Sequence, residues 1–199
     1  MSRIDNHKYY SEVMERYGVS AQGVHWNSQQ TQYKRFEILL EMISLSPEES
    51  VADVGCGFAD LYLYMQHTGI LPQSYVGLEI MEPMVEEARK RVDCEIRVCD
   101  ALVDALPKAD YYICSGAMSL LTRDETYTFI RRCLNASTKG FVFNILEGED
   151  ESMVYNYFRP KEIEAFAREL GSGYEMKRGY LPKDFTVFLK KETASGEHL

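Results

Sequence analysis

The hydrophobic positions of the chain change period several times, and each change indicates a different element. Apolar residues recur at helical spacing between about residues 33 and 43. From residue 51 onward, short apolar runs of strand length alternate with amphipathic stretches of helix length. Five of these runs predict buried strands, at residues 51–54, 75–80, 95–99, 110–114 and 140–145. Strands that alternate with helices at this spacing predict βαβ units and a parallel sheet covered on both faces.

Helix signals lie between and after these strands. Pro83 stands in the first turn of a predicted helix, where its missing N–H costs nothing. Thr122 and Glu125 have the spacing of a capping box, which predicts that a helix begins there. Pro160 begins a further helix, and Gly171 stands where a C-terminal glycine belongs.

The end of the chain breaks the alternation. Residues 174–181 and 185–190 predict two strands joined by a turn, with no helix between them, so they pair antiparallel. We therefore expect an α/β fold with a doubly wound, mostly parallel seven-stranded sheet and an antiparallel terminal hairpin. Within this single domain, residues 1–45 are expected to form an N-terminal helical cap or lid, 46–191 the core, and 192–199 a flexible tail.

Composition excludes several classes of protein. The net charge of −9 makes nucleic acid a poor first candidate, because that binding depends on Lys and Arg. The five cysteines form no CxxC pair, so no zinc site or other metal is predicted. No apolar run approaches the roughly 18 residues of a membrane span, and the first residues lack the apolar stretch of a signal peptide. We therefore expect a cytoplasmic protein with no membrane partner.

The strongest chemical signal follows the first strand, where Asp53, Gly55 and Gly57 precede a helix that begins at about Asp60. Glycines let a ligand lie against the backbone, and ligands of doubly wound sheets bind at the carboxyl ends of the strands. The third glycine of a dinucleotide motif is missing. Asp53 and Asp60 would also place negative charge beside a pyrophosphate. The pattern therefore favours a ligand with a cationic group and disfavours a dehydrogenase.

Two more acids end the next strands. Glu79, about 20 residues past the glycines, is placed to accept hydrogen bonds from both hydroxyls of a ribose. Asp100 ends the third strand, where its carboxylate can accept from the exocyclic amine of adenine or serve only as a turn residue. Small residues from Ser115 to Ala117 follow the fourth strand and would let a ligand approach the backbone.

In this order the motifs resemble those of the class I S-adenosylmethionine-dependent methyltransferases. Their D-x-G-x-G-x-G motif is matched by Asp53, Gly55 and Gly57, with Ala59 in place of the last glycine. The resemblance covers roughly residues 33–191 and implies a Rossmann-like methyltransferase fold with S-adenosyl-L-methionine as cofactor. It implies that Asp53 lies near the methionine end of the cofactor, that Glu79 binds the ribose and that Asp100 borders the adenine. Neighbouring residues are assigned to the same site: Cys56, Ile80, Ala101, Ser115 and Gly116.

The acceptor side is less constrained. Arg35 is a candidate partner for the cofactor's carboxylate, although an Arg on an amphipathic helix is more often solvated. Trp26 and Tyr33 belong to an aromatic N-terminal region that either packs as a fixed cap or closes over the substrate as a lid. Met118 and Asn144 are further candidates for substrate contact. No residue stands out as a catalytic base, and alignment of the reacting atoms supplies most of what methyl transfer needs.

Three functions remain open. The first choice is methyl transfer to an oxygen or nitrogen atom of a small molecule. In the resemblance, enzymes acting on planar amide or exocyclic amine nitrogens carry an Asn/Asp-Pro-Pro-Tyr motif where this chain has residues 115–118. The second is methyl transfer to RNA or protein, which would require a positive rim around the pocket. The third is a non-catalytic protein that binds the cofactor. The sequence does not indicate the oligomeric state.

Overall fold

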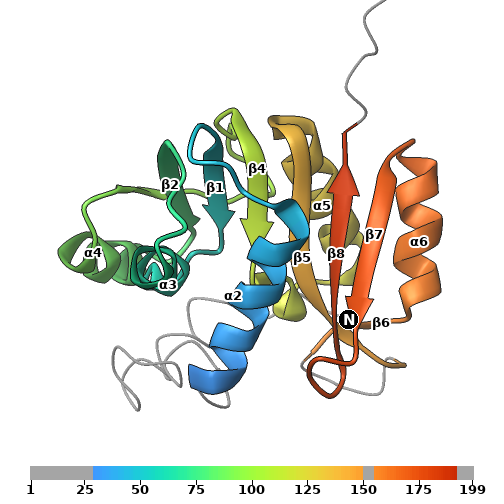
Figure 1. Ribbon diagram of the computed structural model, residues 1–199. Helices are drawn as coiled ribbons and strands as arrows, with labels where there is room; N and C mark the ends of the chain where they lie inside the picture. The colour runs from blue at the N-terminus through green and yellow to red at the C-terminus, as the bar shows by residue number, and fades with distance from the viewer. Residues whose placement is uncertain (1–28, 150–154, 192–199) are drawn as a thin grey trace, which may run out of the picture.

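Eight strands form one sheet in the computed structural model, which describes residues 29–149 and 155–191 (Figure 1). Seven of them follow the order β3-β2-β1-β4-β5-β8-β7. Their bounds are Ser50–Val54 for β1, Ser74–Glu79 for β2, Glu95–Val98 for β3, Ala109–Cys114 for β4, Ser137–Glu147 for β5, Gly173–Arg178 for β7 and Asp184–Lys190 for β8. The eighth, β6 (Tyr157–Phe158), pairs with the end of β5 and is too short to give a periodic signal in the sequence.

The sheet is mostly parallel, as the sequence predicts. The pairs β1–β2, β1–β4, β2–β3 and β4–β5 are parallel, whereas β8 runs antiparallel to both β5 and β7. The reversal of β8 sets Asp184, its first residue, opposite Leu146 near the end of β5. It therefore brings the beginning of the last strand to the edge of the sheet where the parallel strands end.

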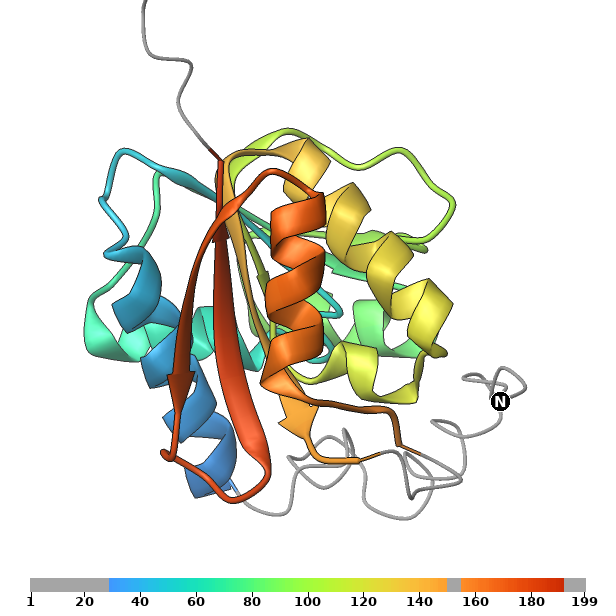
Figure 2. The same cartoon turned by 90° about the vertical axis from the view of Figure 1, so that its right-hand side faces the viewer.

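Helices cover both faces of the sheet. Figure 2 shows α2 (Gln29–Ile43) on one side of β8, with α5 (Arg123–Ala136) and α6 (Pro160–Glu169) on the other. Side chains of α2 and α3 (Asp60–Thr68) share one core cluster, in which Phe36 and Leu39 join Val51 and Val142. The cluster on the opposite face contains Phe129 and Ile163. The remaining helix, α4 (Glu82–Arg91), packs against β2 and β3.

Local signals place the helix ends where the sequence predicts. The hydroxyl of Thr122 accepts from the backbone N–H of Glu125, and the Glu125 carboxylate accepts from the N–H of Thr122 at 2.9 Å. Pro160 is the first residue of α6, and Gly171 has the positive φ of a helix-ending glycine. Among the described residues, no helix is both long enough and apolar enough to cross a membrane.

Candidate functional site

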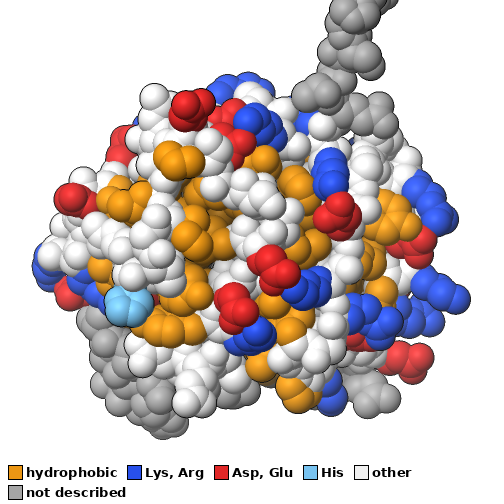
Figure 3. Space-filling model, in the orientation of Figure 1, with side chains coloured by type: hydrophobic (Ala, Val, Ile, Leu, Met, Phe, Trp, Pro, Cys, Tyr) orange, Lys and Arg blue, Asp and Glu red, His pale blue; other side chains and the backbone are white. Residues whose placement is uncertain are grey.

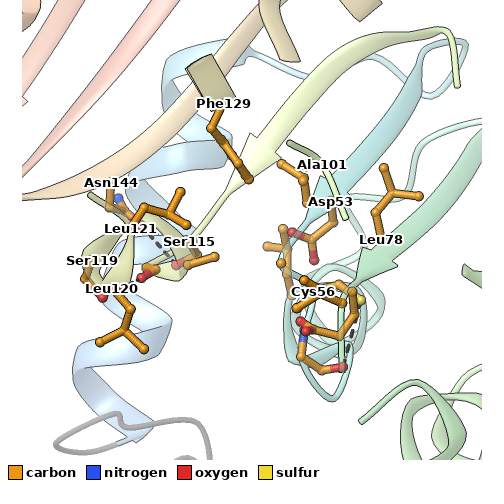
Figure 4. Close-up of a pocket in the computed structure, with 18 of the residues that line it drawn as sticks. Asp53, Cys56, Leu78, Ala101, Ser115, Ser119, Leu120, Leu121, Phe129 and Asn144 are labelled. Carbon is orange, nitrogen blue, oxygen red and sulfur yellow. Dashed lines mark hydrogen bonds between the residues drawn. The ribbon is translucent and has the colours of Figure 1, made fainter. Parts of the chain in front are cut away.

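A cavity of about 320 Å³ lies at the carboxyl ends of β1, β2, β4 and β5. Figure 4 shows two of its walls, with Asp53, Cys56, Leu78 and Ala101 on one side and Ser115, Ser119, Leu120 and Asn144 on the other. The first wall comes from β1, β2 and the segment after β3. The second comes from β4, β5 and η2 (Ala117–Leu120), a short 3₁₀ helix that follows β4. The crevice where the sequence analysis placed the ligand is therefore present.

The glycine loop approaches the second wall closely. Gly55 has φ +76°, and a Cβ added to it would lie 2.3 Å from the Cβ of Ala117. No side chain fits at this position without moving η2. The backbone N–H groups of Gly55 and Cys56 both donate to the carbonyl of Leu78, at 2.7 and 3.2 Å, so the loop is held against the end of β2. The close approach of Gly55 to Ala117 fixes how near the two walls of the cavity lie to each other.

Ala59 stands where the resemblance expects a third glycine, and its backbone is left-handed, with φ +61°. The side chain is fully buried, and its cluster includes Val85 and Ala88 of α4. The position thus demands the conformation that favours glycine, while the methyl group contributes packing against α4.

Glu79 is buried at the end of β2, and its carboxylate binds the backbone of the glycine loop. Its Oε2 accepts from the N–H of Gly57 at 3.0 Å, and its Oε1 accepts from the N–H of Met81 at 3.0 Å. Burial raises the pKa of this carboxyl, and hydrogen bonds from the backbone N–H groups of Met81, Gly57 and Ile80 oppose the rise. A carboxylate offers about four lone-pair sites, so Glu79 keeps acceptor capacity for a ligand in the cavity that it lines.

Asp53 is the most strongly perturbed carboxyl of this wall. Burial raises its pKa to about 7; the hydrogen bond from Tyr75 lowers the pKa, and the negative charges of Glu79 and Asp60 raise it. The Tyr75 hydroxyl donates to Oδ2 of Asp53 at 2.5 Å. A buried carboxyl that titrates near neutrality in a cavity is typical of a functional site, and a cation nearby would favour its charged form.

The remaining predicted residues of the first wall also line the cavity, namely Cys56, Gly57, Ile80, Asp100 and Ala101. Asp100 has a local structural task as well, because its Oδ1 accepts from the N–H of Leu102 at 2.9 Å. Asp60 lies at the N-terminus of α3, where Arg91 pairs with it at 2.7 Å and the amide of Gln32 donates to it at 3.1 Å. Gln32 thus ties α2 to the cavity.

A network of hydrogen-bonded side chains begins at the second wall. The Ser115 hydroxyl donates to Oδ1 of Asn144 at 3.0 Å, and Nδ2 of Asn144 donates to the Thr186 hydroxyl at 2.8 Å. Thr186 shares a hydrogen bond of 2.7 Å with Tyr180, whose hydroxyl donates to Asp184 at 3.3 Å. The network ends at an ion pair between Asp184 and Arg35 of α2.

Arg35 lines the cavity, but it has a partner that the sequence analysis did not consider. Its Nε donates to Oδ2 of Asp184, which also lines the cavity and is almost fully buried. Burial raises the pKa of Asp184, and the guanidinium of Arg35 opposes the rise. The charge of Arg35 is therefore balanced inside the protein, without a ligand carboxylate.

Two of the four predicted substrate residues do not line the cavity. Tyr33 is 37% exposed, and its ring packs on Tyr64 at a centroid distance of 5.1 Å. Met118 is 1% exposed and belongs to the core between the sheet and α5. Trp26 lies outside the described residues, as does the tail from residue 192. Of the four substrate candidates, Asn144 lines the cavity.

Several lining residues were missed from sequence, among them Gln32, Phe129, Tyr155, Tyr157 and Asp184. Apart from Gln32, each lies far along the chain from the glycine loop. The helical period placed Phe129 on the inner stripe of α5, and only this period hinted that it is buried. Asp184 carried no signal, because its place depends on how β8 pairs with β5.

The charges on the cavity wall suit a cationic ligand. Among the described lining residues, five are acidic (Asp53, Asp60, Glu79, Asp100 and Asp184) and one, Arg35, is basic. S-adenosylmethionine carries a sulfonium and an ammonium against one carboxylate. The glycine loop that leaves no room for a Cβ, the remaining acceptor capacity of Glu79 and the acidic wall all fit this cofactor.

Comparison with known proteins agrees with this geometry. Residues 51–140 match the model of a methyltransferase domain family. No curated protein matches the sequence significantly. Among solved structures, magnesium protoporphyrin IX methyltransferase (ChlM) from Synechocystis PCC 6803 with bound SAH superposes with a TM-score of 0.70 at 14% identity, covering 94% of this chain and 95% of that one. The DhpI–SAH complex superposes with a TM-score of 0.70 at 14% identity, covering 92% and 93% of the two chains.

A likeness at such low identity shows the fold, and the family model matches the segment that carries the glycine loop and the three strand-end acids. The chain therefore has the Rossmann-like fold of these methyltransferases. Both of these solved structures contain SAH.

Proposed function

We propose that the protein transfers the methyl group of S-adenosylmethionine to an oxygen or nitrogen atom of a small-molecule acceptor. The observation that carries this proposal is the division of the cavity. Four of the five acids lie at or after the carboxyl ends of β1, β2 and β3, whereas the part beyond β4 is lined mainly by apolar and neutral side chains. One structural neighbour is named as a methyltransferase of magnesium protoporphyrin IX, a small molecule, and another is a complex of DhpI with SAM and HEP.

In this proposal the first wall holds the cofactor. Glu79 accepts hydrogen bonds from the ribose hydroxyls, and Asp100, Ala101 and Ile80 border the adenine. Asp53, Gly55, Cys56 and Gly57 lie along the methionine part, with Ser115 and Gly116 opposite. Since Arg35 is paired with Asp184, we do not assign it to the cofactor's carboxylate. We retain residues 46–191 as the catalytic core, with α2 as the described part of its cap.

The bound cofactor supplies a methyl carbon on a positively charged sulfur, which is already a good leaving group. The protein's task is then to hold the acceptor atom in line with that carbon, and alignment of this kind contributes up to about 7–11 kcal/mol in favourable cases. The cavity walls, held together at Gly55 and Ala117, provide the rigid frame for this alignment.

The direct test has two parts. Calorimetry should detect binding of S-adenosylmethionine and of S-adenosylhomocysteine to the purified chain. A methyl-labelled cofactor should then label a low-molecular-weight fraction of a cell extract, and not its RNA or protein. Label in RNA or protein alone would reject the small-molecule acceptor, and absence of cofactor binding would reject the whole proposal.

Glu79→Gln tests the cofactor arrangement. The charged acceptor of the ribose hydroxyls is lost, and a hydrogen bond to a charged group contributes about 1.5–3 kcal/mol, so cofactor affinity should fall at least about tenfold. Asp110→Asn is the matched control, because Asp110 is a half-buried carboxylate at the opposite edge of the sheet, where it accepts from the N–H of Ser50 at 2.9 Å. Equal affinities of Glu79→Gln and wild type by calorimetry would rule out the ribose assignment.

A further inference from the structure

The part of the cavity beyond β4 differs in charge from the part that we assign to the cofactor. Asp184 is the one acidic residue among the described residues that line this side. Around it the lining is neutral or apolar and comes from three segments: Ser115, Asn144, Ile145, Leu146, Tyr155 and Tyr157. An acceptor in this space meets apolar surface, neutral polar groups and the ion pair of Asp184 with Arg35.

Burial and hydrogen bonds to Asp184 hold that ion pair in place. Side-chain exposure is 16% for Arg35 and 1% for Asp184, so the pair is largely shielded from water. Tyr180 donates to the second carboxylate oxygen of Asp184, and Tyr180 is itself fixed by Thr186. Asp184 is therefore anchored in the orientation in which it accepts from the guanidinium.

Arg35 is the one basic residue among the described residues that line the cavity. An anionic acceptor would need this guanidinium, because no other described cation is available on the wall. To reach it, an anion would have to lie beside the carboxylate of Asp184 or displace it, and in either place the negative charge of Asp184 would repel the anion. Breaking a buried ion pair by removing one partner is strongly unfavourable, since it leaves a charge uncompensated.

We propose that Asp184 is a specificity-determining residue that, by engaging Arg35, excludes carboxylates and phosphates and selects an uncharged acceptor with an apolar body. This inference rests on the proposed function, in which the acceptor occupies the part of the cavity beyond β4. Asp184 acts through Arg35 and through its own charge, and it takes no part in the transfer itself. A repulsive element of this kind is a common source of specificity.

A pair of matched probes tests the charge selection in the wild-type protein. 2-Naphthol and 2-naphthoate share one ring system and differ in charge at pH 7.5. Each is titrated by calorimetry into protein saturated with S-adenosylhomocysteine. We expect 2-naphthol to bind at least about tenfold more tightly than 2-naphthoate. Equal affinities, a preference for 2-naphthoate or no binding of either probe would overturn the inference.

The variant Asp184→Asn tests the residue. Its amide cannot balance the guanidinium, so the affinity for 2-naphthoate should rise at least about tenfold, while that for 2-naphthol changes less than about threefold. The double variant Asp184→Asn with Arg35→Gln should lose the gain. A folded Asp184→Asn, checked by circular dichroism, with unchanged 2-naphthoate binding would overturn the role of Asp184. If the variant does not fold, the wild-type comparison still decides on the charge selection.

The same titrations separate this inference from the function on which it rests. Binding of S-adenosylhomocysteine is measured before each probe is added. If S-adenosylhomocysteine does not bind, the proposed function fails. If it binds and the order of the two probes is reversed, the proposed function stands and the charge selection is wrong.

Discussion

Asp53 joins stability and ligand binding in one side chain. Its carboxyl has an ordinary pKa of 3.8, and burial raises that pKa to about 7 in the folded protein. Folding therefore favours the protonated form. The stability that this gives is fully present below pH 3.8 and is lost as the pH rises through 7. A cationic cofactor has the opposite preference, because it binds the ionised form more tightly.

Asp53→Asn should show both effects. Between pH 6 and pH 8, wild-type affinity for S-adenosylmethionine should rise by about tenfold more than that of the variant, since Asn does not titrate. Without cofactor, the free energy of unfolding of the variant relative to wild type should increase from pH 4 to pH 7.5 and then level off. Calorimetry and urea unfolding at a series of pH values measure the two quantities. Parallel pH profiles for the two proteins would contradict the role of Asp53.

Ala59 combines an unfavourable backbone with favourable packing. The left-handed conformation costs about 1–2 kcal/mol for a residue with a Cβ, and burial of one methyl group contributes about 0.8 kcal/mol. Ala59→Gly removes the strain and the methyl, and it also frees the unfolded chain. We therefore expect the free energy of unfolding to change by less than about 1 kcal/mol.

Ala59→Val is the contrasting variant. A β-branched side chain at φ +61° is a genuine outlier, and its extra methyls would press on Val85 and Ala88. We expect a loss of about 2 kcal/mol or more, measured by urea unfolding beside Ala59→Gly. Equal stability of the two variants would show that backbone strain at this position is unimportant.

At the level of elements, the site depends on the loop after β1 meeting η2 after β4. These elements are about 60 residues apart in sequence, and Gly55 is the point at which they touch. Their separation explains why the sequence indicated a need for small residues at both places without indicating that they contact each other.

Gly55→Ala should be strongly destabilising and should abolish cofactor binding. Its Cβ would lie 2.3 Å from that of Ala117, and its φ is +76°; together, overpacking and left-handed strain cost about 2–5 kcal/mol. Adding Ala117→Gly removes the collision but not the strain, so the double variant should recover about 1–3 kcal/mol. Urea unfolding of the four proteins gives the coupling energy. Additive losses would mean that the two residues do not collide.

At the scale of the whole molecule, the net charge is negative, and acidic and basic side chains are interspersed on the surface shown in Figure 3. On the face shown in Figure 3, blue and red side chains lie beside one another in several places. Many basic residues of the described chain are paired, for example Arg131 with Glu169 at 2.9 Å and Arg168 with Glu164 at 2.6 Å. The basic residues that cluster at positions 89–91 of α4 and 131–132 of α5 are thus partly neutralised, since Lys90, Arg91 and Arg131 each pair with an acid.

A tRNA gel shift tests this distribution of charge. With a net charge of −9, the protein should give no shift at about 50 mM salt, since affinity for phosphates requires unneutralised Lys and Arg. A shift that weakens as salt increases would contradict this expectation and support an RNA acceptor. A known basic RNA-binding protein serves as the positive control.

What the sequence by itself determined is local and periodic. The apolar runs predicted the strands, the prolines and the capping box predicted helix ends, and the Asp53 to Gly57 motif with Glu79 and Asp100 predicted where a cofactor lies. These signals are readable because each depends on residues close together in the chain, and because the carboxyl ends of parallel strands always share one edge.

Only the tertiary structure decided the acceptor side. Asp184 reaches the cavity because β8 runs against β5, and Arg35 becomes its partner because α2 packs against β5 and β8. Tyr33 and Met118 do not line the cavity, because Tyr33 packs on Tyr64 and Met118 packs in the core once the elements are assembled. Contacts between distant segments are set by the pairing and packing of whole elements, and no short stretch of sequence records them.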